Sequence, residues 1–84
     1  MNNKALVEIA VPSAGQKYDV FIPLGCRMSD VIKMVAGALS DLSDGKYKAT
    51  DEAILCDAET GIIFNINMEV AELGIKTGSR LVLI

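Results

Sequence analysis

Histidine and tryptophan are both absent from this 84-residue chain. Without histidine, the sequence lacks the side chain most often used as a general base and a frequent metal ligand. A cysteine without a histidine partner is a poor nucleophile, and the serines and glycines form no nucleophile elbow, P-loop or dinucleotide fingerprint. The spacing of the acidic residues fits no EF-hand loop. We therefore predict no enzymatic activity, no cofactor and no metal site.

Cysteine is scarce, occurring only as Cys26 and Cys56, and the two do not form a Cys-x-x-Cys pair. Isolated cysteines are typical of reduced thiols in a cytoplasmic protein, with a disulfide or a reactive thiol as the alternatives. The first residues form no signal-peptide core, because Glu8 and Pro12 interrupt the apolar stretch. No apolar run approaches the roughly 20 residues that span a bilayer. We expect a cytoplasmic protein without membrane insertion.

Basic residues are outnumbered by acidic ones, 8 against 11, which gives a net charge of −3. This balance argues against nucleic acid, whose phosphates attract basic surfaces. Only two Phe and two Tyr are present although 51% of the residues are apolar, so aliphatic side chains must build the core. The length predicts a single domain over residues 1–84, and the apolar excess leaves room for a contact patch on the surface.

Two alternating stretches near the N-terminus predict a β-hairpin. Residues 5–11 place Val7 and Ile9 on one face, and residues 18–24 do the same with Val20 and Ile22. A short loop containing glycine separates the two stretches, which favours antiparallel pairing. Both faces of the first stretch are fairly apolar, so a slip of one residue would exchange them.

The apolar period then changes to that of a helix, predicted over about residues 30–43. Ser29 is a suitable N-cap, and Gly45 is placed to cap the other end. Apolar side chains recur on one stripe of this helix, at Ile32, Val35, Leu39 and Leu42. Met34 falls on the polar face beside Gly37, and we take it as a candidate contact residue because methionine is a soft, adaptable side chain.

Four shorter elements are predicted in the second half: strands at 53–56 and 62–64, a helical turn at 67–73 and a final strand at 80–84. Three leucines in these elements are expected to face the core, namely Leu73, Leu81 and Leu83. Hairpin, helix, two short strands, helical turn and last strand form the order of a β-grasp. We therefore predict an α+β fold in which one main helix packs across a mixed sheet of four or five strands.

The end of the chain carries the most specific pattern. It reads leucine, glycine, isoleucine, a glycine turn and a leucine-rich strand, at Leu73, Gly74, Ile75, Gly78, Arg80, Leu81 and Leu83. This pattern resembles the ending common in ubiquitin-like domains, and the resemblance covers essentially the whole chain. Size and ending look most like the YukD/EsaB family, small ubiquitin-like proteins that accompany bacterial type VII secretion machinery. The resemblance implies an accessory or regulatory interaction module with secretion-machinery components as partners.

The ending also bears on conjugation. Conjugable relatives carry a flexible tail ending in Gly-Gly, whereas here the last carboxylate belongs to Ile84, on or next to the final strand. A β-branched residue held in a sheet cannot enter a narrow catalytic channel unless the strand unravels. We therefore expect a non-conjugated module. The alternative is a ubiquitin-like modifier or sulfur-carrier relative whose Gly-Gly tail is absent from this chain. A gene continuing past Ile84 would favour that alternative, and neighbouring secretion genes would favour the module.

Protein binding is expected on the outward faces of two neighbouring strands. If Leu81 and Leu83 face the core, Val82 and Ile84 must face outward, since adjacent strand residues point to opposite sides. One residue of the pair Ile54 and Leu55 must face outward for the same reason. We take Ile54, Leu55, Val82 and Ile84 as candidate protein-binding residues, with Met34 as a separate candidate. The alternatives are an uncovered sheet face without a partner and a contact in a weak homo-oligomer.

Overall fold

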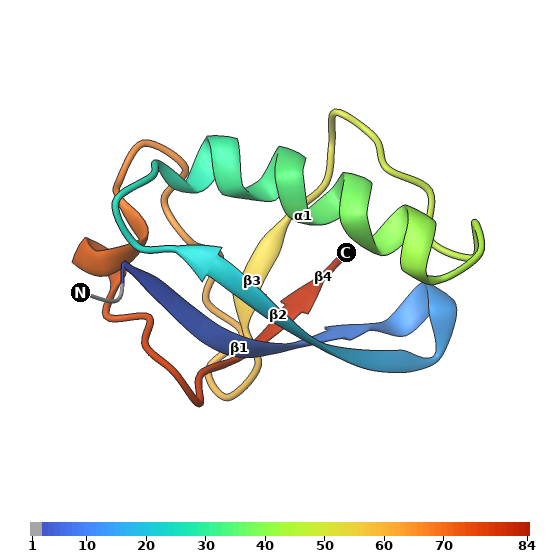
Figure 1. Cartoon of the computed structure of the whole chain (residues 1–84), viewed down its shortest axis with the longest axis horizontal. Coiled ribbons are helices and arrows are strands. Elements are labelled where there is room, and N and C mark those ends of the chain that lie inside the picture. Colours follow the sequence, from blue (N-terminus) through green and yellow to red (C-terminus); the bar gives the residue numbers. More distant parts are fainter. Residues whose placement is uncertain (1–2) are drawn as a thin grey trace.

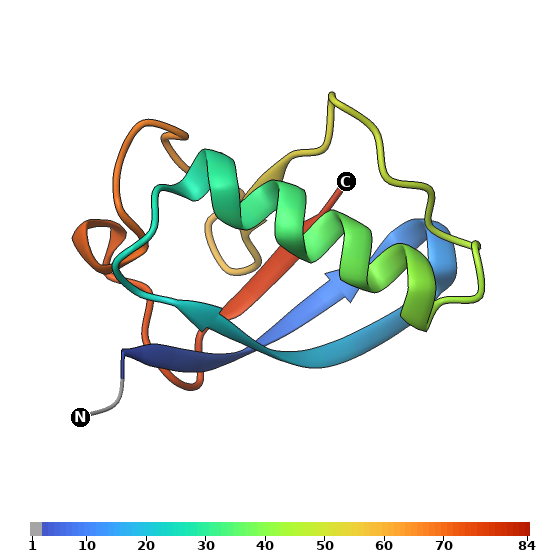
Figure 2. The same cartoon turned by 45° about the horizontal axis from the view of Figure 1, so that its top comes forward.

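The computed structural model describes residues 3–84, which form one sheet and one long helix (Figure 1). The elements in chain order are β1 (Lys4–Val11), a 3₁₀ turn (Pro12–Ala14), β2 (Gln16–Pro23), α1 (Met28–Leu42), β3 (Leu55–Asp57), a second 3₁₀ turn (Val70–Leu73) and β4 (Arg80–Leu83). The strand order is β2-β1-β4-β3, with β1 parallel to β4 and the other neighbours antiparallel. The helix crosses one face of this mixed sheet (Figure 2). The predicted β-grasp order is confirmed.

The N-terminal hairpin has the register that its alternation predicts. Val7 pairs with Val20 and Ile9 pairs with Tyr18, and both β1 residues are fully buried beneath the helix. The turn between the strands needs a left-handed residue, which Gly15 supplies with φ 64° while its N–H donates to the carbonyl of Pro12. Val20 is only half-buried, because β2 is the border strand of the sheet.

The helix begins at Met28, before the predicted start, and the expected N-cap role of Ser29 is wrong. Ser29 lies inside the first turn, and the N-cap position is held by Arg27, whose side chain makes no capping bond. The first N–H groups of a helix need other acceptors in that case. They find them in a distant loop: the N–H of Met28 donates to the carbonyl of Met68 at 2.8 Å, and that of Ser29 to Ile66 at 3.0 Å.

The far end of the helix is closed by Gly45, as predicted. Its N–H donates to the carbonyl of Ser40 at 2.9 Å, while Asp44 adopts the left-handed conformation with φ 54°. This is the Schellman arrangement, in which the chain reverses direction as the helix ends. The reversal carries the chain toward Tyr47, whose side chain is 5% exposed and whose burial raises the pKa of its hydroxyl.

Leu42 was expected in the core, and this expectation is wrong because its side chain is 61% exposed. Leu42 is the last helical residue, and the loop that follows covers the end of the core in its place. Tyr47 supplies the apolar volume there, and its N–H donates to the hydroxyl of Ser43 at 2.9 Å. Helical periodicity could not have predicted this replacement, since Tyr47 lies outside the helix.

The core otherwise follows the apolar pattern. Most residues predicted to be buried are buried: Val7, Ile9, Ile22, Ile32, Val35, Leu39, Leu81 and Leu83. Val20 and Leu73 are half-buried and pack against this cluster. The strand predicted at 62–64 is reduced to a single bridge between Cys56 and Ile63, because the chain turns back at Gly61 with φ 73° and then leaves β3.

Candidate functional site

An apolar surface lies on the open face of the sheet, opposite the helix. Ile54 and Ile84 exchange two backbone hydrogen bonds, at 3.0 and 2.9 Å, so their side chains stand together on one face. Two residues along the ladder, and so on the same face, Val82 lies opposite Cys56, whose sulfur is 3.8 Å from the carbonyl oxygen of Val82. Ile54 is 38% exposed, Ile84 is 65% exposed and Val82 is half-buried. We call Ile54, Val82 and Ile84 the β3–β4 patch.

Leu55, the second candidate of the pair with Ile54, does not belong to this patch. Its side chain is fully buried in the core, opposite Leu83 in β4. The prediction left open which of Ile54 and Leu55 faces outward, because nothing in the local sequence separates the two alternatives. The register with β4 decides between them, since Leu55 pairs with Leu83 and must share its inward direction.

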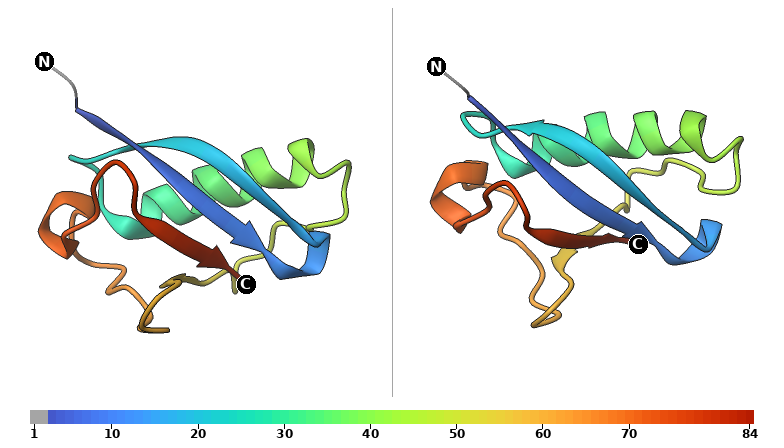
Figure 3. Two further views of the ribbon diagram at one scale, coloured as in Figure 1. Left: turned by 90° about the horizontal axis from the view of Figure 1, so that it is seen from below. Right: turned by 60° about the horizontal axis from the view of Figure 1, so that its bottom comes forward.

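Met34 lies on the outward side of α1, so it faces the opposite way from the β3–β4 patch. The helix covers one face of the sheet, whereas the patch occupies the other face (Figures 1 and 3). Met34 is 47% exposed, as its position on the polar stripe predicts. Nearby Gly37 has no heavy atom within 4 Å of the position that a Cβ would occupy, so nothing within the described chain requires a glycine there. The two candidate surfaces are therefore separate.

A charged row runs across the open face beside the β3–β4 patch. Glu8 of β1 lies opposite Arg80 on one side and opposite Asp19 on the other. The guanidinium of Arg80 donates to Glu59 at 2.8 Å, and both side chains are exposed. The hydrogen bond that Arg80 donates to Glu59 raises the pKa of Arg80, and the negative charges of Glu59, Glu8 and Asp57 raise it further. Acidic groups outnumber basic ones in this row.

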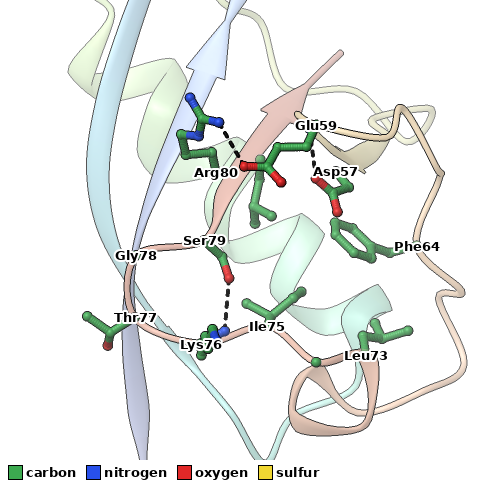
Figure 4. A pocket seen from close by; sticks show the side chains of 12 residues that line it. Asp57, Glu59, Phe64, Leu73, Ile75, Lys76, Thr77, Gly78, Ser79 and Arg80 are labelled. Carbon is green, nitrogen blue, oxygen red and sulfur yellow. Dashed lines mark hydrogen bonds and ion pairs between the residues drawn. The ribbon is translucent and has the colours of Figure 1, made fainter.

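A cavity of about 280 Å³ lies next to this row, between the turn before β4 and the loop after β3 (Figure 4). Its polar groups bond one another: Asp57 Oδ1 accepts the N–H of Glu59 at 2.8 Å, and Ser79 Oγ accepts the N–H of Lys76 at 3.0 Å. These contacts order the two loops. Within residues 3–84, no group of three or more Cys, Asp or Glu side chains is placed to hold a metal ion.

The two cysteines are free thiols, as predicted. They differ in solvent access. Cys26 lies just before the helix and is exposed, whereas Cys56 in β3 is only 7% exposed. We expect a thiol reagent to modify native Cys26 on the order of tenfold or more faster than Cys56, which must await local opening. Kinetics of the Cys26→Ser and Cys56→Ser variants measure each rate separately. Equal rates in the two variants would contradict the burial of Cys56.

Sequence reasoning missed two other exposed apolar areas. One lies in the loop after β3, at Ile62, Ile63 and Ile66, and the other pairs Leu6 with Phe21 on the open face of the hairpin. A signal for the first was present, because adjacent isoleucines in a half-buried strand cannot both point inward. The second follows from the register of the hairpin, in which Leu6 shares the outward direction of Glu8.

The fold is a ubiquitin-like β-grasp: a mixed four-stranded sheet with one helix across it and a 3₁₀ turn leading into the last strand. The EccD5 ubiquitin-like domain from Mycobacterium xenopi superimposes with a TM-score of 0.80 at 20% identity, covering 99% of this chain and 94% of that one. The ubiquitin-like domain of the Mycobacterium tuberculosis type VII secretion protein EccD1 gives 0.77 at 16% identity, covering 100% and 99%.

A larger assembly contains the same fold. A chain of the MycP5-free ESX-5 inner membrane complex matches with a TM-score of 0.73 at 19% identity, covering 99% of this chain and 21% of that one. No family model and no curated protein matches the sequence. In the part of the chain that the structure describes, no helix has both the length and the apolar character needed to cross a membrane.

Proposed function

We propose that this protein is a non-covalent docking module of a bacterial type VII secretion system, acting as a YukD/EsaB-like accessory or regulatory component in the cytoplasm. The observation that carries the proposal is the β3–β4 patch, an exposed apolar surface built on a rigid ladder. The backbone bonds between Ile54 and Ile84 hold the main chain that carries these side chains, so little backbone freedom is lost when a partner covers them.

The fold likeness supports the secretion assignment. Ubiquitin-like domains of EccD proteins share the complete arrangement of this chain, and one of them comes from a protein named as part of a type VII secretion system. A fold alone does not define a function, so the proposal depends on the surface as well. The likeness supports the proposed class of partner, and the exposed patch supports the proposed place of binding.

The charges beside the patch indicate the character of the partner surface. The row of Glu8, Asp19 and the Glu59–Arg80 pair carries more acid than base. A complementary surface would place a basic group next to its apolar contact, because opposite charges across an interface speed association and fix its register. Binding should therefore weaken as salt is added.

We expect Val82→Asp and Ile54→Asp each to weaken binding of secretion-machinery components at least about tenfold, because each places a charge in the apolar contact. The measurement is co-purification with tagged protein from its own host, with the bound proteins identified and quantified. Circular dichroism spectra check that each variant is folded.

The matched control is Met34→Asp, which makes the same chemical change at a comparably exposed position on the other side of the molecule. It should leave the bound proteins unchanged. If Met34→Asp removes them and the two patch variants keep them, the helix face is the docking surface and the β3–β4 patch is not.

A further inference from the structure

The border strand β2 has a free edge. It is the first strand in the order β2-β1-β4-β3, and among the described residues only β1 pairs with it (Figure 3). The strand is as long as β1, running from Gln16 to Pro23. Free edges present unpaired N–H and C=O groups that can pair with another strand.

The backbone bonds show which groups of β2 face outward. The N–H of Glu8 donates to Ser79 and the carbonyl of Leu6 accepts from Gly78, so these β1 residues are bonded toward β4. The alternate β1 residues, such as Val7 and Ile9, must then bond toward β2, where their partners are Val20 and Tyr18.

The remaining residues of β2 are the outward ones, namely Lys17, Asp19, Phe21 and Pro23, of which proline has no N–H to donate. Lys17, Asp19 and Phe21 all have exposed side chains, and within residues 3–84 the only strand that pairs with β2 is β1, on its other edge. Their side chains share the open face of the sheet, since they pair with Ala10, Glu8 and Leu6. The free edge therefore combines open hydrogen-bonding groups with a lysine and an aspartate two residues apart.

The order Lys17, Tyr18, Asp19 is self-complementary in charge. In an antiparallel pair of two β2 strands centred on Tyr18, each Lys17 lies opposite Asp19 of the second copy. Both are outward-bonded residues, so each such pair can exchange two backbone hydrogen bonds and also join opposite charges on the same face. We propose that two copies of this chain associate through β2, joining their sheets into one continuous sheet.

Charge selects this register over its neighbour. Moving the centre by one residue to Asp19 places the two aspartates directly opposite each other, and like charges opposite each other are destabilising. Centring on Lys17 opposes two lysines with the same result. The lysine and aspartate thus disfavour these two adjacent registers and favour the one that pairs them.

The edge contact leaves the β3–β4 patch free. β2 and β3 are opposite borders of the sheet, so a copy bound at β2 does not approach Ile54 or Ile84 through the sheet. Association through β2 and docking through the patch can therefore be tested separately, and each can fail without the other.

Sedimentation equilibrium of the wild-type protein over a wide range of concentrations is the first test. The average mass should rise from that of the monomer toward that of the dimer. Lys17→Asp and Asp19→Lys should each raise the dimer dissociation constant about tenfold or more, because two attractive pairs become repulsive. An equimolar mixture of the two variants should associate again, since every contact in the mixed dimer then joins aspartate to lysine.

Lys33→Asp and Asp30→Lys are the matched controls, since they make the same changes on exposed positions of the helix. They should leave self-association unchanged. Two results would overturn the proposal. One is a mixture of the two β2 variants that stays monomeric, and the other is a control variant that dissociates the dimer as strongly as the β2 variants do.

A further test removes a backbone donor together with the Asp19 carboxylate, and Asp19→Asn, which loses the charge but keeps the N–H, is its control. Asp19→Pro removes one outward N–H donor but leaves the ladder with β1 intact, and proline is tolerated on an edge strand with its nitrogen toward solvent. This variant should be monomeric where the wild type dimerises. In the wild type, amide hydrogen exchange at Lys17 and Asp19 should slow as the concentration rises. A monomer at every concentration, or exchange at these amides that is independent of concentration, would show that β2 does not pair.

Discussion

Replacing Leu39 with alanine should lower the free energy of unfolding by about 2–5 kcal/mol. Leu39 has no exposed surface and sits on the inward stripe of α1, between the sheet and the helix axis. Removing its side chain leaves a cavity that the surrounding aliphatic residues fill only in part. Small domains are stable by only about 5–15 kcal/mol in total, so this loss is a large fraction of the whole.

Leu42→Ala is the matched control, because the same atoms are removed from the same helix at a side chain that is 61% exposed. Its effect should stay within about 0.5 kcal/mol, as for ordinary surface positions. Urea unfolding of both variants and the wild type gives the two differences directly. Equal losses for the two leucines would show that the inward stripe of α1 extends to the last turn of the helix.

The contrast between these leucines shows how far periodicity can predict the fold. Leu39 and Leu42 both lie on the apolar stripe of the sequence, and the pattern treats them alike. Only the chain reversal at Gly45 brings Tyr47 over the end of the core and leaves Leu42 outside. That replacement depends on a contact between a helix and the loop after it, which a helical period does not encode.

The helix start shows the same limit. Ser29 is a good N-cap by residue type, yet the first N–H groups bond to carbonyls in the 65–69 loop. Carbonyl groups that are close in space but distant in sequence, those of Ile66 and Met68, accept the bonds that a local cap would otherwise accept. Segments with a strong period, such as β1 and α1, were predictable because their own residues decide their faces, whereas caps and short strands depend on partners elsewhere in the chain.

The candidate site, like the fold, could be predicted only in part. Val82 and Ile84 could be placed outward from the sequence, since Leu81 and Leu83 had to face the core. Their joining to Ile54 required the antiparallel register of β3 with β4, and the free edge of β2 required the strand order. Both surfaces arise from pairing between segments distant in sequence, which alternation within one segment cannot reveal.

The choice between Ile54 and Leu55 can be tested with a second variant of large effect. Leu55→Asp should prevent folding at room temperature, because it places an unpaired charge in the core beside Leu83, at a cost of about 5 kcal/mol or more. Ile54→Asp should fold, since its side chain can reach water from the open face. The two substitutions are chemically identical and adjacent in sequence, so composition and net charge are matched.

Far-ultraviolet circular dichroism and a urea melt of each variant distinguish the outcomes. A folded Leu55→Asp protein together with an unfolded Ile54→Asp protein would mean that β3 pairs with β4 one residue out of the register described here. Such a slip would exchange the two faces of β3 and bring Leu55 to the surface beside Ile84. The β3–β4 patch would then contain Leu55 in place of Ile54, and the docking experiment would have to be repeated with Leu55 as the open-face residue.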